Sequence, residues 1–273
     1  MAGKLYVVGT PIGNLGDMTD RARRTLASVD LVAAEDTRRT GKLLAHFGIT
    51  ARTVSLFEGN DAARSAELLD ALRDGKDVAI VSDAGMPVVS DPGHRIVAAC
   101  IEDGIEVRVI PGPSAAIAAL VVSGLPSDRF SFEGFPPRRK GERLARLKEL
   151  AGDSRTLVFF ESPKRAGATL REIVETLGDR RVALVRELTK MHEEVMRGRA
   201  SEVAESITEG LKGEVALVVQ GAEEPEPDMD AASEEAEALV GRGMKKRPAA
   251  AEAARRHRVP ANDVYRRLIG RGP

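Results

Sequence analysis

Residues 81–93 read VSDAGMPVVSDPG and join two segments of different character. The run DVAIV at 77–81 is typical of a buried parallel strand. Residues 94–102 carry apolar side chains at helical spacing and favour an amphipathic helix. A loop between a strand and a helix lies at the carboxyl edge of an open α/β sheet, where ligands bind. We therefore expect this loop to line a ligand site.

The two aspartates of the loop have different expected roles. Asp91 precedes Pro92, which favours Asp91 as a helix N-cap and Pro92 as the first helical residue. Asp83 ends the strand with no helix to cap directly, so a ligand contact and an ordinary loop role are equally open.

Strands and helices alternate through the first two-thirds of the chain, which predicts an α/β fold with a mostly parallel sheet covered by helices. The expected strands are 5–9, 30–34, 77–81 and 106–110, and the expected helices are 19–27, 37–47, 61–73, 94–102 and 115–122. A break near 125 indicates a second domain, with strands near 129–133, 156–161, 181–187 and 214–219. We expect an N-terminal α/β domain at 1–124 and a second α/β domain at 125–222.

The remaining residues divide by charge into an acidic linker and helix at 223–243 and a basic helical tail at 244–273. Residues 223–237 contain eight acidic side chains and no basic one, whereas 244–273 contain nine Lys and Arg against two acids. Two short helices, 248–257 and 262–269, flank Pro260 and resemble a small helix-turn-helix module. Nucleic-acid contact and a solvated tail are equally open, as they are for the basic cluster at 138–148.

Composition excludes several classes of protein. The chain has 273 residues, 42% of them hydrophobic and 30% charged, which is typical of a globular protein. It has no run of about 18 apolar residues and no basic-then-apolar start, so we expect a cytoplasmic protein without a membrane span or secretory signal. The single cysteine, Cys100, is expected to pack in a core. Four histidines without metal-ligand spacing predict no metal site.

Six predicted strands end in polar or Gly/Pro-rich segments, which together favour one shared cleft. The segments are 9–14 (GTPIGN), 35–38 (EDTR), 82–93, 111–114 (PGPS), 161–165 (ESPKR) and 186–190 (RELTK). The first lacks the G-x-G-x-x-G pattern, and Pro11 lacks the N–H that a phosphate cradle uses. We therefore exclude a dinucleotide cofactor.

In their order and composition these segments resemble the ribosomal RNA small subunit methyltransferase I group of the tetrapyrrole methylase superfamily. The likeness covers residues 5–198 and extends more weakly to 270. It implies two α/β domains with the cofactor cleft between them, plus a small helical C-terminal module. Members that make tetrapyrroles have glycine-rich versions of the first loop and of the Asp83 loop, whereas this chain agrees with the RNA-modifying branch at Thr10, Pro11, Ala84 and Pro87.

The resemblance implies S-adenosylmethionine as cofactor and the 2′-hydroxyl of a cytidine in the decoding region of 16S rRNA as acceptor, within the 30S subunit. It also implies a homodimer. The positions that match cofactor contacts are Ile12, Val81, Ser82, Asp83, Met86, Ser114, Ala115, Phe160 and Gly198. Arg38, Lys164, Arg165 and Arg186 are interpreted as phosphate ligands that bind RNA.

Transfer to a ribose hydroxyl requires alignment of oxygen, methyl and sulfur, and a positioned base can remove the proton. The candidate catalytic residues are Glu187, Lys190 and Lys164, with Asp36 and Glu161 as further candidates. Ion pairing across the cleft explains any one of them equally well, so the base stays open. Two alternatives come from other classes: a small-molecule methylase of the tetrapyrrole type, and a non-catalytic ribosome-binding factor that retains the fold.

Overall fold

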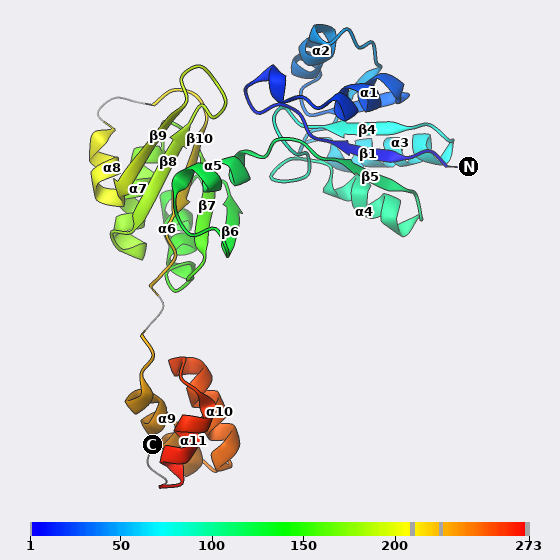
Figure 1. Cartoon of the computed structure of the whole chain (residues 1–273). Helices are drawn as coiled ribbons and strands as arrows, with labels where there is room; N and C mark the ends of the chain where they lie inside the picture. The colour runs from blue at the N-terminus through cyan, green and yellow to red at the C-terminus, as the bar shows by residue number, and fades with distance from the viewer. Residues whose placement is uncertain (1, 208–210, 224–225, 271–273) are drawn as a thin grey trace. The chain divides into compact units, whose positions relative to one another are not determined.

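The computed structural model describes residues 2–207, 211–223 and 226–270. Contacts within the chain define two compact units, Met1–Gly221 and Ala222–Pro273. The first unit contains two five-stranded sheets, and the second contains three helices (Figure 1). No helix among the described residues is both long and apolar enough to cross a membrane.

The first sheet is entirely parallel, with the order β3-β2-β4-β1-β5, which confirms the α/β prediction. Its strands are β1 (Leu5–Val8), β2 (Leu31–Ala34), β3 (Thr53–Ser55), β4 (Val78–Val81) and β5 (Val107–Ile110). A short 3₁₀ turn, η1 (Leu15–Asp17), follows β1, and the helices are α1 (Asp20–Ser28), α2 (Thr37–His46), α3 (Asp61–Arg73) and α4 (His94–Glu102).

Successive strand residues point to opposite faces of this sheet and pack in two separate cores. On one face Val32 and Val81 pack with Leu26 of α1 and Leu44 of α2. On the other face Ile80 packs with residues of α3 and α4, among them Leu68, Leu72, Ile96 and Cys100. Cys100 is fully buried, as predicted, and burial raises the pKa of its thiol to about 11. Because β4 is buried on both faces, its carboxyl end is a rigid platform for the loop that follows.

The second sheet is mixed, with the order β6-β7-β10-β8-β9. Only β6 and β7 are parallel; the other neighbours are antiparallel. The strands are β6 (Phe130–Gly134), β7 (Thr156–Glu161), β8 (Arg181–Arg186), β9 (Glu194–Arg199) and β10 (Val215–Val219). The helices of this region are α5 (Ala115–Ser123), α6 (Lys140–Glu149), α7 (Ala166–Leu177) and α8 (Ala200–Ser206).

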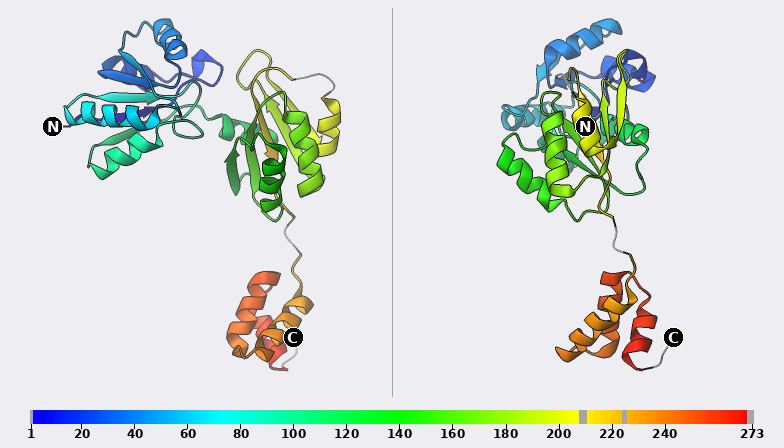
Figure 2. Two further views of the ribbon diagram at one scale, coloured as in Figure 1. Left: turned by 180° about the vertical axis from the view of Figure 1, so that it is seen from behind. Right: turned by 90° about the vertical axis from the view of Figure 1, so that its left-hand side faces the viewer.

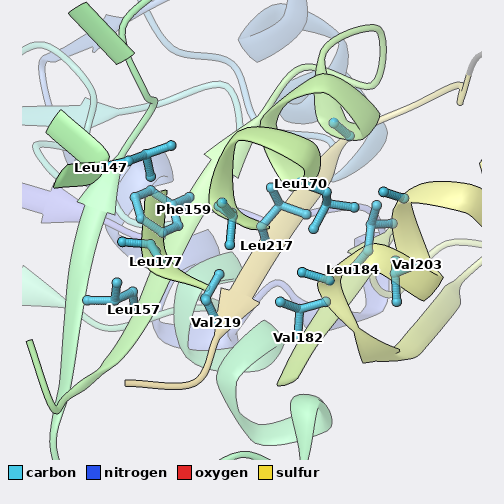
Figure 3. Close-up of a cluster of buried hydrophobic side chains, with 14 of the residues drawn as sticks. Leu147, Leu157, Phe159, Leu170, Leu177, Val182, Leu184, Val203, Leu217 and Val219 are labelled. Atoms are coloured by element: carbon cyan, nitrogen blue, oxygen red, sulfur yellow. The ribbon is translucent and has the colours of Figure 1, made fainter. Parts of the chain in front are cut away.

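Helices cover both faces of the second sheet. Figure 3 shows one core, in which Leu147 of α6, Leu170 of α7 and Val203 of α8 pack with strand residues such as Phe159 and Leu217. Helix α5 packs on the opposite face, where Ala116, Ala119 and Leu120 contact strands β7, β8 and β10. The predicted domain boundary at 124 places α5 with the first sheet, but α5 packs on the second. Figures 1 and 2 show the helix beside the strands of the second sheet.

One local prediction was wrong. Asp91 does not cap α4: the N-cap is Gly93, with a left-handed φ of 115°, and the helix begins at His94. A left-handed N-cap turns the chain so that Asp91 instead lines a cavity beside Ser82. In the basic cluster at 138–148, for which RNA contact and a solvated helix face are both open, Arg143 is buried and serves neither role. Its guanidinium donates to both carboxylate oxygens of Glu172, at 2.5 and 2.8 Å.

The C-terminal unit consists of α9 (Met229–Gly241), α10 (Lys246–His257) and α11 (Ala261–Leu268), so both predicted tail helices are confirmed. Its core is built mainly from alanines, with Ala232 and Ala236 of α9 against Ala250, Ala253, Ala254 and Val264. Ion pairs join α9 to the tail, from Glu235 to Arg256 and from Asp230 to Arg267. The acidic helix and the basic tail therefore fold as one unit.

Candidate active site

A cavity of about 460 Å³ opens at the carboxyl ends of β1, β2 and β4 and is completed by residues of the second sheet. Its volume lies in the range of small-molecule sites. Six of the predicted cofactor residues line it, namely Ile12, Asp83, Met86, Ser114, Ala115 and Phe160. They come from four segments that are far apart in sequence, so the fold gathers most of this predicted set in one place.

The other three predicted cofactor residues lie elsewhere. Val81 is buried within β4, and Ser82 lines a second, adjoining cavity of about 320 Å³. Gly198 pairs with Val182 on the edge strand β9, and it does not line either of these two cavities.

Backbone hydrogen bonds join the first two loops of the site. The N–H of Thr10 donates to the carbonyl of Gly85 at 2.9 Å, and the N–H of Gly85 donates to the carbonyl of Thr10 at 3.1 Å. Gly85 has φ 82°, a conformation that glycine adopts without strain. Gly13 sits closely against the loop after β8, since a Cβ there would lie 2.5 Å from Lys190 Cγ.

Three carboxyl groups, Glu35, Asp83 and Asp91, line one part of the cavity. Asp83 accepts from the N–H of Asp36 at 3.1 Å and pairs with Arg39 at 3.1 Å. Burial, together with the charges of Glu35 and Asp83, raises the pKa of Asp91 to about 6, although a hydrogen bond with Ser82 opposes the shift. An excess of negative charge in a cavity favours a cationic ligand.

The remaining walls offer amide and apolar groups. Ser114 caps α5, its hydroxyl accepting from the N–H of Ile117, and the cavity lies at the amino end of that helix. The positive end of the helix dipole attracts carboxylate or other acceptor groups. Phe135 and Phe160, with ring centroids 5.6 Å apart, supply an apolar wall together with Val185.

Two of the candidate catalytic residues, Glu187 and Lys190, form an ion-pair network with Glu214. Lys190 Nζ lies 2.8 Å from Glu187 Oε1 and 3.0 Å from Glu214 Oε2. The bond from Lys190, with a second from the N–H of Glu214, lowers the pKa of Glu187. Partial burial disfavours the charged form of Lys190, but its bonds with Glu187 and Glu214 outweigh this and raise its pKa. Neither group is arranged to accept a proton near neutral pH.

The predicted phosphate ligands are mostly engaged within the protein. Arg165 pairs with buried Glu161 at 2.6 Å, and Arg186 pairs with Glu194 at 2.7 Å. Arg38 is highly exposed and pairs with Asp36, and this contact holds the pKa of Asp36 well below its usual range. Lys164 is exposed and lines neither cavity. Arg39, which the sequence analysis missed, lines both cavities.

Strained backbone is concentrated in two loops of the site. Among the described residues other than glycine, φ is positive at Val88 and Ser90 in the Asp83 loop, at Glu187 and Thr189 after β8, and at Arg258. Left-handed conformations of β-branched residues are costly, and such strain clusters at functional sites. Thr189 Oγ1 is also buried, without a hydrogen-bond partner in the part of the chain that the structure describes.

Comparisons with known proteins agree with this geometry. The sequence model of the tetrapyrrole (corrin/porphyrin) methylases matches residues 4–204. The ribosomal RNA small subunit methyltransferase I of Mycobacterium tuberculosis is 48% identical over 259 residues, covering 94% of this chain and 90% of that protein. The protein of the same name from Thermotoga maritima is 51% identical over 222 residues, covering 81% of this chain and all of that protein.

Solved structures show the same fold at lower identity. Uroporphyrin-III-C-methyltransferase from Thermus thermophilus has a TM-score of 0.56 at 24% identity, covering 80% of this chain and 94% of the other. A diphthine synthase has a TM-score of 0.61 at 15% identity, covering 80% of this chain and 90% of the other.

The raised pKa of Asp91 predicts a pH-dependent effect of Asp91→Asn on stability. Because the pKa is 3.8 in the unfolded chain and about 6 in the fold, wild-type stability falls as pH rises between these values. Asparagine carries no such cost, so the variant should gain on the order of 1 kcal/mol above pH 6 and almost nothing near pH 4. Urea unfolding across this range measures the difference. Exposed Asp74→Asn is the control, and a pH-independent difference for Asp91→Asn would contradict the assignment.

Proposed function

Because this chain belongs to the tetrapyrrole (corrin/porphyrin) methylase family, we propose that it transfers a methyl group from S-adenosylmethionine to a ribose 2′-hydroxyl of small-subunit ribosomal RNA. The observation that carries the proposal is the gathering of Ile12, Asp83, Met86, Ser114, Ala115 and Phe160 around one cavity. The name shared by relatives over most of the chain supplies the substrate class.

The groups around the cavity fit the cofactor. Asp83, Asp91 and Glu35 suit its cationic sulfonium and ammonium groups. The amino end of α5, at Ser114 and Ala115, suits its carboxylate or the acceptor nitrogens of adenine. Ile12, Met86 and Phe160 offer apolar contacts for the ring and the side chain. These three kinds of contact together suit a molecule that carries both charges and an apolar ring.

The residues of this chain contribute mainly by alignment. When bound, S-adenosylmethionine would supply an electrophilic methyl group with a neutral thioether as the leaving group, and the residues around the cavity would hold the ribose oxygen in line with the carbon–sulfur bond while its proton passes to water. The strained loops at 82–93 and 187–190 set the positions of the cavity walls before ligands arrive. The carboxylates around the cavity favour the cofactor over its demethylated product, because the product has no positive charge on sulfur and loses this attraction.

Glu187, Lys190 and Lys164 fit positioning roles better than that of a general base. Lys190 lines the second cavity and carries a proton, so it can donate a hydrogen bond to an oxygen of the acceptor. Glu187 and Glu214 hold its ammonium group in place. Lys164 is exposed beside the first cavity, where Ser162 and Pro163 contribute to the wall, so it suits contact with RNA outside.

The finer features of the proposal follow the resemblance: a cytidine of the decoding region as target, the assembled 30S subunit as substrate, and a cytoplasmic homodimer. Ile117 and Val121 support association, since they stand one turn apart on α5 and are 46% and 71% exposed. The alternatives receive less support. The relatives at 48% and 51% identity are named for ribosomal RNA rather than for a small molecule, and a cavity with this donor set is not expected in a binding factor without catalysis.

Methyl transfer is the direct test of the proposed function. Incubation of the full-length protein with labelled S-adenosylmethionine and undermethylated 30S subunits should label one alkali-resistant dinucleotide of 16S rRNA. Resistance is expected because a 2′-O-methyl group removes the nucleophile that alkaline cleavage needs. Label on a base, or transfer only to a porphyrin precursor, would contradict the proposal.

Asp83→Asn should weaken S-adenosylmethionine binding roughly 10- to 150-fold, the value of a charge-assisted contact of about 1.5–3 kcal/mol. Asparagine keeps an oxygen that can accept from the N–H of Asp36, so the loop should stay in place. Calorimetry measures the affinity, with Asp74→Asn as a matched exposed control. Wild-type affinity in the folded variant would remove Asp83 from the cofactor site.

Removal of residues 222–273 should weaken binding to 30S subunits at least roughly tenfold and leave cofactor affinity unchanged. Cutting before α9 is necessary because α9 shares its core with α10 and α11. Lys245, Lys246 and Arg247 make no ion pair among the described residues. Neutralising all three in the full chain should reduce the dependence of 30S binding affinity on salt concentration, as should removal of the unit. Equal affinity and salt slope for all forms would mean that this unit does not contact RNA.

A further inference from the structure

The second cavity adjoins the first and shares five of its lining residues, Ile12, Arg39, Asp83, Ala84 and Glu214. With a volume of about 320 Å³ it is large enough for a small-molecule-sized group. A group held there stands next to whatever occupies the first cavity. This contiguity is what a transfer reaction needs, with the donor on one side and the acceptor on the other.

One wall of the second cavity is a face of α2 (Thr37–His46). Arg39, Lys42 and His46 line it and are spaced i, i+3 and i+7, so they follow one another along the same side of the helix. Pro11 and Leu15, from the loop after β1, also line the cavity. Pro11 has no backbone N–H to offer an anion. At this position an anion relies on side chains, and those of α2 line the same cavity.

The basic side chains around this cavity differ in whether a carboxylate of the protein pairs with them. Arg39 pairs with Asp83 at 3.1 Å, and Lys190 pairs with Glu187 and Glu214. Lys42 and His46 are exposed at the wall, and no carboxylate within the described part of the chain forms an ion pair with either. The α2 wall thus keeps the Lys42 ammonium and the His46 ring as hydrogen-bonding groups without a carboxylate partner among the described residues.

We propose that the second cavity is the acceptor site, where Lys42 and His46 bind the phosphate next to the target ribose. The inference rests on the proposed function and adds the residues that position its substrate. A lysine ammonium suits a phosphate as a point charge, and an imidazole N–H donates a further bond. Phosphate contacts set the register of a nucleic acid. The ribose then lies at the junction of the two cavities, beside Asp83 and Ala84.

The test compares full-length Lys42→Gln/His46→Gln with wild type and with Lys76→Gln. Lys76 is an exposed lysine just before β4, at the opposite end of that strand from the cavities. The probe is undermethylated 30S subunits, with KM and kcat measured over a range of potassium chloride concentrations. A second arm measures binding of a fluorescent RNA of the 16S decoding region without turnover, and calorimetry measures S-adenosylmethionine affinity.

The double variant should raise KM roughly tenfold or more, leave kcat and cofactor affinity near wild type, and reduce the salt slope by about 1. Lys76→Gln should match wild type. A KM and slope equal to those of Lys76→Gln would overturn the inference, as would a parallel loss of cofactor affinity. If wild type transfers no methyl group to 30S subunits, the proposed function fails, and the RNA-binding arm still decides on Lys42 and His46. If wild type also binds no RNA, both fail.

Discussion

The pair of backbone hydrogen bonds between Thr10 and Gly85 is the constraint on which the site depends. It joins the loop after β1 to the loop after β4, although 75 positions separate the two residues. Ile12, Asp83 and Met86 consequently face one cavity. The rigid support comes from β4, a strand buried on both faces. Strain at Val88 and Ser90 is tolerated because this framework determines the loop's course.

Sequence periodicity predicted the elements that bury continuous apolar residues, such as β1 and β4, and missed those that do not. β3 has three residues, and β9 reads EVMRGR at a sheet edge, with two adjacent apolar residues and no alternation, so neither gives a strong signal. The role of Asp91 depended on a left-handed φ at Gly93, which residue type alone does not specify. Likewise, the packing of α5 on the second sheet depends on which face of an almost wholly apolar helix is buried.

The site was predictable at the level of segments and less so at the level of contacts. The glycine- and proline-rich strand ends do gather, because parallel strands present their carboxyl ends at one edge. Charged residues within those segments could not be separated into ligand-binding and structural groups, since Arg165 and Arg186 find partners in Glu161 and Glu194 only in the fold. Arg39 and Lys42 could have been found by placing the predicted helix 37–47 on a helical wheel and asking which side bears cations.

The alanine core of the C-terminal unit has a consequence for how this gene can change over time. All members of that core lie between Ala232 and Val264, so no side chain of the two sheets is needed to complete it. A lineage could therefore acquire or discard the whole segment in one step without opening a hole in the remaining structure. Within the segment, by contrast, drift is constrained, because a side chain larger than alanine at these closely packed positions would push the helices apart. The packing of the C-terminal unit therefore favours its gain or loss as a whole.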